Sequence, residues 1–250
     1  MTNGSTINKP ENGRRYAVGD IHGCAKTFEA LLWEKLSLQK SDQLFLLGDY
    51  IDKGPDNKKV LDIILALQAE GYTIFALKGN HEYFLETDVA YSRQPGNWHK
   101  LNDLLEAQDL INAEGSIDQR YLDFVHDLPY YFILDNYVLV HAGLNFDQPD
   151  PFSDTESMLY IRGYRVDRSR IGNRIIVHGH TPIGIDEIRS GLDRRERTGT
   201  INLDNGCVFD YAPDPTKTGD LGRLCALDLD ALELIIQPCL EKNSSDQNKG

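Results

Sequence analysis

Three short apolar runs in the first third of the chain alternate with helical patterns. The runs cover residues 14–18, 44–47 and 72–77, and turn residues bound each of them, which predicts buried strands. Between the runs, residues 25–36 and 60–67 place apolar side chains at helical spacing. Such strand–helix–strand units join neighbouring parallel strands through right-handed crossovers. The pattern therefore predicts an α/β fold that begins with a parallel sheet.

Polar side chains stand where these three strands end. Asp20 and His22 follow the first strand, Asp49 follows the second, and Asn80 and His81 follow the third. The carboxyl ends of neighbouring parallel strands meet at one edge of the sheet. We therefore expect these five side chains to lie in one site.

The rest of the chain departs from this regular alternation. Residues 83–119 predict a helical insertion over the site, and residues 118–127 predict a further helix. Later strands are expected at residues 130–134, 137–140, 174–177, 200–203, 224–229 and 232–236, with the last three forming an antiparallel finish. Polar residues 1–13 and 241–250 are expected to be disordered tails on a single domain that covers residues 14–240.

Composition narrows the class of protein. The 250 residues carry a formal net charge of -13, which argues against the broad basic surface of a nucleic-acid binder. No apolar run is long enough for a membrane span, and residues 1–13 lack the apolar stretch of a secretory signal. The four cysteines are sparse and have no CxxC spacing, so reduced thiols are expected. These features predict a cytoplasmic protein without membrane or nucleic-acid partners.

Histidines are concentrated at the predicted strand ends. Five of the seven histidines follow apolar strands next to a small residue, namely His22, His81, His141, His178 and His180. Imidazole and carboxylate ligands together suit zinc, iron or manganese better than calcium or magnesium. The sequence therefore predicts a transition-metal site at these strand ends.

Five motifs in a fixed order carry a family resemblance. They are GDIHG (19–23), GDYIDKG (48–54), GNHE (79–82), HAGL (141–144) and HGHTP (178–182). Over residues 14–236 the chain resembles the calcineurin-like metallophosphoesterases, and within them the bacterial PPP-type serine/threonine protein phosphatases. The resemblance implies a four-layer α/β/β/α sandwich of two mixed β-sheets flanked by helices.

The resemblance also implies a centre with two divalent metal ions, with manganese favoured and iron or zinc as alternatives. Its ligands would be Asp20, His22 and Asp49 for the first ion and Asp49, Asn80, His141 and His180 for the second. His178 would neighbour the centre without binding an ion. The two ions would activate water for in-line attack on phosphorus, so no nucleophilic side chain is needed.

The resemblance assigns further roles around this centre. His81 would be the general acid that protonates the leaving group, and Asp52 would orient it. Arg162 would bind phosphate together with Asn80, and Arg165 is the alternative arginine. Lys53 would also bind phosphate. It stands where the family usually has arginine, which can grip two phosphate oxygens at once, whereas lysine is a point donor.

Three functions are compatible with the motifs. The leading one is a metal-dependent phosphomonoesterase acting on phosphoserine or phosphothreonine in proteins. The alternative is a symmetrical diadenosine tetraphosphate hydrolase of the ApaH type. Those enzymes usually carry aspartate after GNH, so Glu82 favours the protein phosphatase. A non-catalytic binding scaffold is the third hypothesis, and the presence of every ligand position argues against it.

Overall fold

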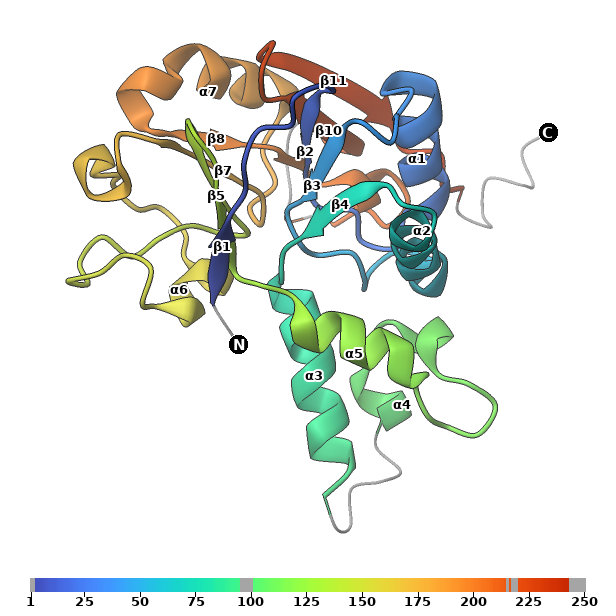
Figure 1. The fold of residues 1–250 in the computed structure, drawn as a ribbon. Helices are drawn as coiled ribbons and strands as arrows, with labels where there is room; N and C mark the ends of the chain where they lie inside the picture. The colour runs from blue at the N-terminus through green and yellow to red at the C-terminus, as the bar shows by residue number, and fades with distance from the viewer. Residues whose placement is uncertain (1–2, 95–100, 215, 217–219, 243–250) are drawn as a thin grey trace.

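Two mixed β-sheets pack face to face in this protein (Figure 1). The computed structural model describes residues 3–94, 101–214, 216 and 220–242. We call the sheets sheet I and sheet II. Sheet I contains, in spatial order, β11 (Glu233–Pro238), β10 (Arg223–Asp228), β2 (Arg15–Val18), β3 (Gln43–Leu46) and β4 (Thr73–Ala76), with β9 (Asp204–Asn205) beside β10.

Sheet I contains the predicted parallel unit. β2 pairs in parallel with β3, and β3 pairs in parallel with β4, so the three strands leave the sheet at the same edge. β10 is antiparallel to both β2 and β11. The last two strands of the chain, β10 and β11, thus form the antiparallel pair that the sequence predicted.

Sheet II departs from the sequence-based expectation at its last strand. Its strands are, in order, β1 (Gly4–Thr6), β5 (Tyr131–Ile133), β6 (Tyr137–Val140), β7 (Ile175–His178) and β8 (Thr200–Asn202). β5 and β6 form the predicted hairpin. The antiparallel expectation is wrong for residues 200–203, because β8 pairs in parallel with β7, to which the crossover helix α7 connects it.

The central strands β2 and β3 of sheet I are buried on both faces. Phe45 of β3 points into the core between the sheets, where its ring stacks on Phe75 with centroids 5.0 Å apart. Leu44 and Leu46 point the other way, into the core beneath the helices. Because successive side chains of a strand face opposite sides, a continuous apolar run is what a doubly covered strand requires.

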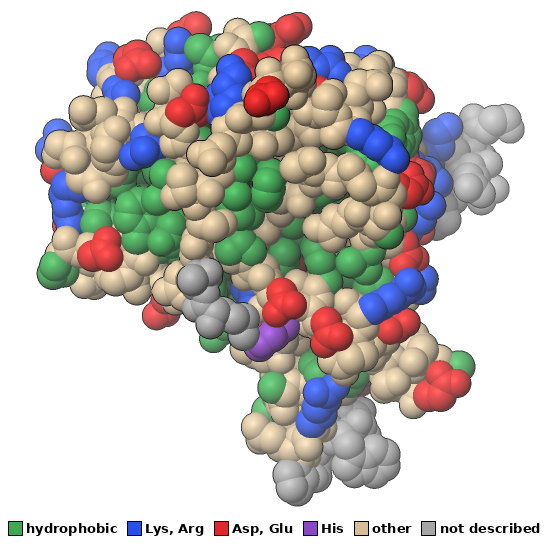
Figure 2. All heavy atoms as spheres, in the orientation of Figure 1, with side chains coloured by type: hydrophobic (Ala, Val, Ile, Leu, Met, Phe, Trp, Pro, Cys, Tyr) green, Lys and Arg blue, Asp and Glu red, His purple; other side chains and the backbone are tan. Residues whose placement is uncertain are grey.

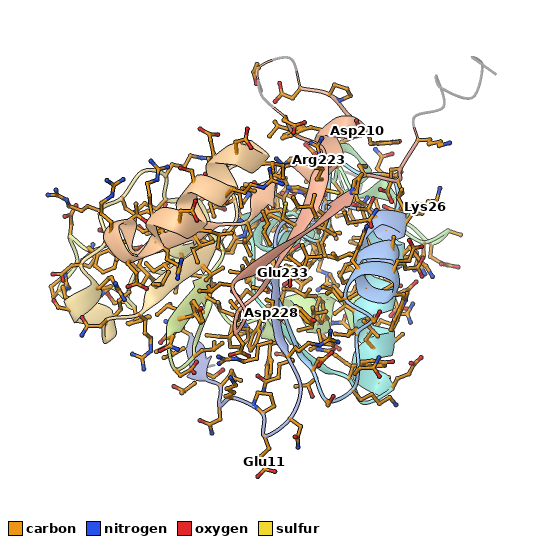
Figure 3. The ribbon with its side chains drawn as sticks, turned by 90° about the horizontal axis from the view of Figure 1, so that it is seen from above. Glu11, Lys26, Asp210, Arg223, Asp228 and Glu233 are labelled. Atoms are coloured by element: carbon orange, nitrogen blue, oxygen red, sulfur yellow. The ribbon has the colours of Figure 1, made fainter. Side chains whose placement is uncertain are left out.

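Helices cover the outer faces of the sandwich. α1 (Ala25–Ala30), the π-helical turn η1 (Leu31–Lys35) and α2 (Asn57–Ala69) pack on sheet I. α6 (Thr155–Tyr160) and the turn η3 (Arg168–Ile171) pack on sheet II, while α7 (Ile185–Thr198) closes the core beside β8. Seen from above, α7 lies on one side of the sheets and α1 and α2 lie on the other (Figure 3). The predicted fold class is confirmed.

The helical insertion projects from one end of the sandwich (Figure 1). It consists of α3 (Asn80–Ser92), α4 (Leu101–Leu104), the turn η2 (Gln108–Leu110) and α5 (Gln119–Asp127), which packs beside α3. The short turn η4 (Cys207–Asp210) is not part of the insertion and contacts β10 of sheet I. The helical pattern of residues 101–111 is divided between α4 and η2. Figure 2 shows apolar side chains reaching the surface in the middle of this face of the molecule, with charged side chains along its rims.

Both expected tails carry structure within the described residues. The expectation of a disordered tail over residues 1–13 is wrong for β1, which pairs in parallel with β5. At the other end, Glu241 is buried and its carboxylate accepts hydrogen bonds from the Lys26 and Thr27 amides at 2.8 and 3.3 Å. Residues 243–250 lie outside the described chain. Within the described chain, no helix is long and apolar enough to cross a membrane.

Candidate metal centre

The six predicted metal ligands lie together at the strand ends of both sheets. Those of sheet I follow β2, β3 and β4, and those of sheet II follow β6 and β7. All six are buried, namely Asp20, His22, Asp49, Asn80, His141 and His180. The core packing of the two sheets therefore brings residues that are far apart in sequence into one site.

Asp49 lies between two groups of candidate ligands. Its Oδ2 is 3.5 Å from His22 Nε2, and its Oδ1 is 3.4 Å from His141 Nε2. Potential donor atoms of His22, Asp49 and His81 lie within 4.8 Å of one another, and so do those of Asp49, His141 and His180. A carboxylate with one oxygen toward each group has the geometry expected of a bridging ligand.

Asn80 and Asp20 are the two remaining candidate ligands, and both contact His180. Asn80 Oδ1 is 3.0 Å from His141 Nε2 and 2.9 Å from His180 Nδ1. Asp20 lies on the other side of His180, whose backbone amide donates to its Oδ2 at 3.0 Å. The loops that follow β2 and β7 are thereby joined at the centre.

Backbone carbonyls fix the tautomers of two histidines. His22 Nδ1 is 2.9 Å from the Ile51 carbonyl, and His141 Nδ1 is 2.9 Å from the Leu47 carbonyl. Each Nδ1 must carry the proton to donate this bond, so each Nε2 keeps a lone pair. His141 Nε2 then faces the acceptor oxygens of Asp49 and Asn80. Acceptors that face one another in a buried site require a cation between them, so this donor set fits a metal ion.

The electrostatics of the centre also suit cations. Burial lowers the pKa of His22 and His141, and burial together with His141 lowers that of His180 to about 3, so these imidazoles are neutral. Burial and the neighbouring carboxylates Asp204 and Asp49 raise the pKa of Asp20. Neutral imidazoles beside closely spaced buried carboxylates are the charge pattern that a bound divalent ion stabilises.

The backbone is strained at this site. Among the described non-glycine residues, eight have a positive φ, and five of these belong to the site, namely His22, Asp49, Asp52, Lys53 and His180. Left-handed conformations are unfavourable for such residues and concentrate at functional sites. Gly79 permits the close approach of two loops, because a Cβ there would lie 2.2 Å from Asp49 Oδ1. Strained backbone conformations therefore orient these side chains toward the site.

The predicted acid and its partner form a pair at the rim. His81 Nδ1 is 2.7 Å from Asp52 Oδ2, and His81 Nε2 is 3.9 Å from Asp49 Oδ2. Burial lowers the pKa of His81, but the charge of Asp49 and the bond to Asp52 outweigh burial, and the pKa is raised. A protonated imidazole at the edge of the centre can donate a proton to a leaving group.

Two basic side chains flank the centre. Lys53 Nζ is 3.0 Å from His22 Nε2, and Arg162 Nη1 donates to Thr181 Oγ1 at 2.9 Å, next to His180. The exposed guanidinium of Arg162 is thus held at the HGHTP loop. His178 belongs to β7 and lines a cavity of about 260 Å³ with Arg162, behind the candidate ligands. No role for Arg165 follows from its exposed position.

Comparison with known proteins identifies the family. Residues 13–214 match the family described as Calcineurin-like phosphoesterase. The chain belongs to this family. It is therefore a metal-dependent phosphoesterase with a phosphoester substrate.

Three similar proteins carry related names. The asymmetrical bis(5'-nucleosyl)-tetraphosphatase PrpE of Anoxybacillus flavithermus is 26% identical over 226 residues, covering 77% of this chain and 85% of that protein. The symmetrical bis(5'-nucleosyl)-tetraphosphatase of Nitrosomonas europaea is 33% identical over 130 residues, but the match covers only 52% of this chain and 44% of that protein. The crystal structure of a putative diadenosine tetraphosphatase matches with a TM-score of 0.58 and 25% identity, covering 93% of this chain and 97% of that chain.

Glu82 of the phosphoesterase has a positioning role that sequence reasoning missed. Its carboxylate accepts hydrogen bonds from the backbone amides of Asp49 at 2.8 Å, Tyr50 at 2.8 Å and Gly79 at 2.9 Å. Charge-assisted bonds of this kind are strong in a buried site. Glu82 therefore fixes the loop after β3 against the loop after β4.

Asp204 is a second buried acid that sequence reasoning missed. It lies in β9, its Oδ1 accepts the Gly206 amide at 2.7 Å, and burial raises its pKa to about 6. Its negative charge contributes to the raised pKa of Asp20. The sequence did carry a signal for Asp204. This acid directly follows the predicted strand at residues 200–203, and polar residues at strand ends were the pattern that predicted the other site residues.

The site residues suggest a division of labour when the metal centre is loaded. Divalent ions bound there would supply positive charge to the phosphate oxygens and would activate water as the nucleophile. The six buried side chains would hold these ions, with Asp49 between the two groups of donor atoms. Arg162 and Lys53 would bind and orient the phosphate, and His81, held by Asp52, would give its Nε2 proton to the leaving oxygen.

Proposed function

We propose that this phosphoesterase hydrolyses dinucleoside tetraphosphates of the diadenosine type. The proposal is supported by the similar proteins, which are named as tetraphosphatases, and by an aromatic wall beside the candidate centre. The sequence alone favoured a serine/threonine protein phosphatase, with the diadenosine tetraphosphate hydrolase as the alternative. The comparisons support that alternative better, and they include both symmetrical and asymmetrical enzymes.

Glu82 loses its value as a marker for a protein phosphatase. Both of its carboxylate oxygens are occupied by backbone amides, so the side chain faces the protein and not the substrate. A residue that braces two loops does not select between a phosphoprotein and a dinucleotide. The preference for a phosphoprotein or a dinucleotide must therefore be set by the surface around the centre.

The observation that carries the proposal is an aromatic wall beside His81. The ring of Phe84, which is 41% exposed, lies 5.6 Å from the His81 ring and 6.0 Å from the Tyr160 ring. Behind them, Tyr83, Tyr130 and Tyr160 line a cavity of about 650 Å³. An exposed ring is a stacking platform for a nucleobase. A base stacked on Phe84 would lie next to His81, at the edge of the candidate centre.

Direct competition between substrate classes tests the proposal. Protein loaded with manganese is given diadenosine tetraphosphate or a phosphoserine peptide under identical conditions, and kcat/KM is measured for each. We expect the dinucleotide to be preferred, with all hydrolysis abolished in Asp49→Asn. A preference for the phosphopeptide would overturn the proposal, and hydrolysis of neither by folded protein would support a scaffold. The products separate symmetrical cleavage, into two diphosphates, from asymmetrical cleavage, into a triphosphate and a monophosphate.

The aromatic wall gives a prediction for one substitution. Phe84→Ala should raise KM for diadenosine tetraphosphate by about tenfold, since stacking of a base contributes about 1–3 kcal/mol. KM for a small non-aromatic phosphomonoester should stay unchanged. Tyr91→Ala is the matched control, because Tyr91 is equally exposed on α3 but lies about 10 Å further along the helix. Equal effects of the two substitutions would exclude Phe84 as a base platform.

A phosphomonoesterase acting on phosphoproteins is the second candidate, and the His81–Asp52 pair favours it. The alkoxide that leaves from phosphoserine is strongly basic and needs a proton, whereas a departing nucleotide phosphate is a weak base. A histidine at the rim whose pKa is raised has more to contribute to the first reaction than to the second. The substrate comparison above decides between the two candidates.

A further inference from the structure

Three cysteine thiols meet at a place separate from the phosphoesterase centre. Cys24 precedes α1, Cys207 begins η4, and Cys239 follows β11, yet their Sγ atoms all lie within 4.8 Å of one another. Cys24 and Cys207 are fully buried, and Cys239 is partly accessible. A single buried cysteine is ordinary core packing. Three sulfurs converging from three distant segments form a donor set.

The surroundings of the thiols provide an additional oxygen donor. Cys239 Sγ is 3.4 Å from Oε2 of the buried Glu241, whose other oxygen accepts the Lys26 and Thr27 amides. Cys24 Sγ is 3.5 Å from the His22 carbonyl. In Figure 3, Lys26 at the start of α1 and Asp210 at the end of η4 lie on the same side of the molecule. The three thiols themselves meet in the apolar core between sheet I and its helices.

We propose that Cys24, Cys207 and Cys239 form a second metal site, which binds a thiophilic divalent ion such as Zn²⁺ with Glu241 as the adjacent oxygen donor. Zinc–sulfur bonds of about 2.3 Å in a tetrahedral site place sulfurs about 3.8 Å apart. Thiols within 4.8 Å reach that arrangement through shifts of about 1 Å. Binding displaces the thiol protons to solvent and involves no change of oxidation state.

The position of this thiol site connects it to the phosphoesterase loops. Cys24 directly follows the GDIHG loop that carries Asp20 and His22, and Cys207 lies just after Asp204. Cys239 brings the end of β11 to the same point. A bound ion would tie these three segments together behind the catalytic centre. The site is structural in this proposal, and it does not depend on which phosphoester is the substrate.

Cobalt spectroscopy tests the proposal on the whole chain. Reduced, metal-free protein is titrated with Co²⁺ without oxygen, and the thiolate-to-cobalt charge-transfer band in the near ultraviolet is recorded. The phosphoesterase centre offers only nitrogen and oxygen donors, so it contributes no such band. We expect a band whose amplitude at saturation corresponds to one thiolate-bound cobalt per chain, which disappears on addition of Zn²⁺ and survives in Asp49→Asn.

Substitutions assign the band to the three thiols. Cys24→Ala and Cys207→Ala should lose it, while Cys225→Ala should keep it, because Cys225 is equally buried but lies on β10 outside the cluster. Circular dichroism establishes that each variant is folded. Absence of the band in folded wild-type protein saturated with cobalt would overturn the proposal. So would a band that persists in folded Cys24→Ala and Cys207→Ala.

Discussion

Asp49 can serve both halves of the centre because its two carboxylate oxygens face different histidines. Oδ2 faces His22, and Oδ1 faces His141. Burial raises the pKa of Asp49, but positive charges around it, among them those of His81 and Lys53, outweigh burial and lower the pKa below its usual value. The carboxylate is therefore ionised and ready to bind cations. Its left-handed backbone places it at the point where the ends of both sheets meet.

Lys53 is the residue at which the chain departs from the family pattern. Lys53→Arg should leave the metal content unchanged and lower KM severalfold with a smaller change in kcat. The reason is that guanidinium grips two phosphate oxygens, whereas the ammonium contacts them singly. Steady-state kinetics and elemental analysis check this expectation. Loss of metal in the variant would show that Lys53, 3.0 Å from His22 Nε2, has a structural role instead.

The His81–Asp52 pair predicts a pH dependence. The pKa of His81 is raised, so the imidazole stays protonated to a higher pH, and turnover of a phosphoserine peptide should fall as the pH rises through that pKa. Asp52→Asn removes one charge that raises this pKa, and it should move the falling limb of kcat to lower pH by about one unit. Asp88→Asn, further along α3, is the control. An unmoved limb in Asp52→Asn would remove His81 from the role of general acid.

At the scale of elements, α1 depends on a residue from the far end of the chain. Cys24, its N-cap, makes no side-chain capping bond, and the Glu241 carboxylate accepts the first amides instead. Glu241→Ala should lower the free energy of unfolding by about 1 kcal/mol, the typical contribution of an N-terminal cap. Chemical denaturation measures this loss. Glu233→Ala, exposed on β11, should change stability little, and an equal loss there would contradict the capping role.

The elements that the sequence predicted are those with a strong local pattern. β2, β3 and β4 are apolar on both faces, so their runs and the polar residues at their ends are visible in the sequence, and the structure brings those residues together. β1 was missed because Gly4–Thr6 is a short, polar edge strand without hydrophobic alternation. The brace made by Glu82 and the meeting of the three thiols were missed because they depend on tertiary contacts between distant segments.

At the scale of the whole molecule, Arg15 joins the sheets at the end opposite the centre. Its buried guanidinium lies 2.6 Å from Asp135, in the β5–β6 turn of sheet II, and 2.6 Å from Asp230, in the β10–β11 turn of sheet I. A buried cation with two partners is expensive to disrupt, but both aspartates are partly exposed, which reduces the cost.

Arg15→Ala should therefore lower the free energy of unfolding by about 2 kcal/mol, as measured by urea denaturation. Lys58→Ala serves as the control, because its pair with Asp62 lies on the surface of α2 and should contribute less than about 1 kcal/mol. If both substitutions cost the same, Arg15 does not link the two sheets energetically.

The pairing of β1 with β5 has a consequence for the solution behaviour of the protein. Gly4–Thr6 covers the backbone of Tyr131–Ile133, which would otherwise be the open margin of sheet II. An uncovered strand margin is a template for another chain, and β5 is rich in aromatic and β-branched side chains. A protein trimmed before Ile7 should therefore self-associate through sheet II while its catalytic residues stay intact.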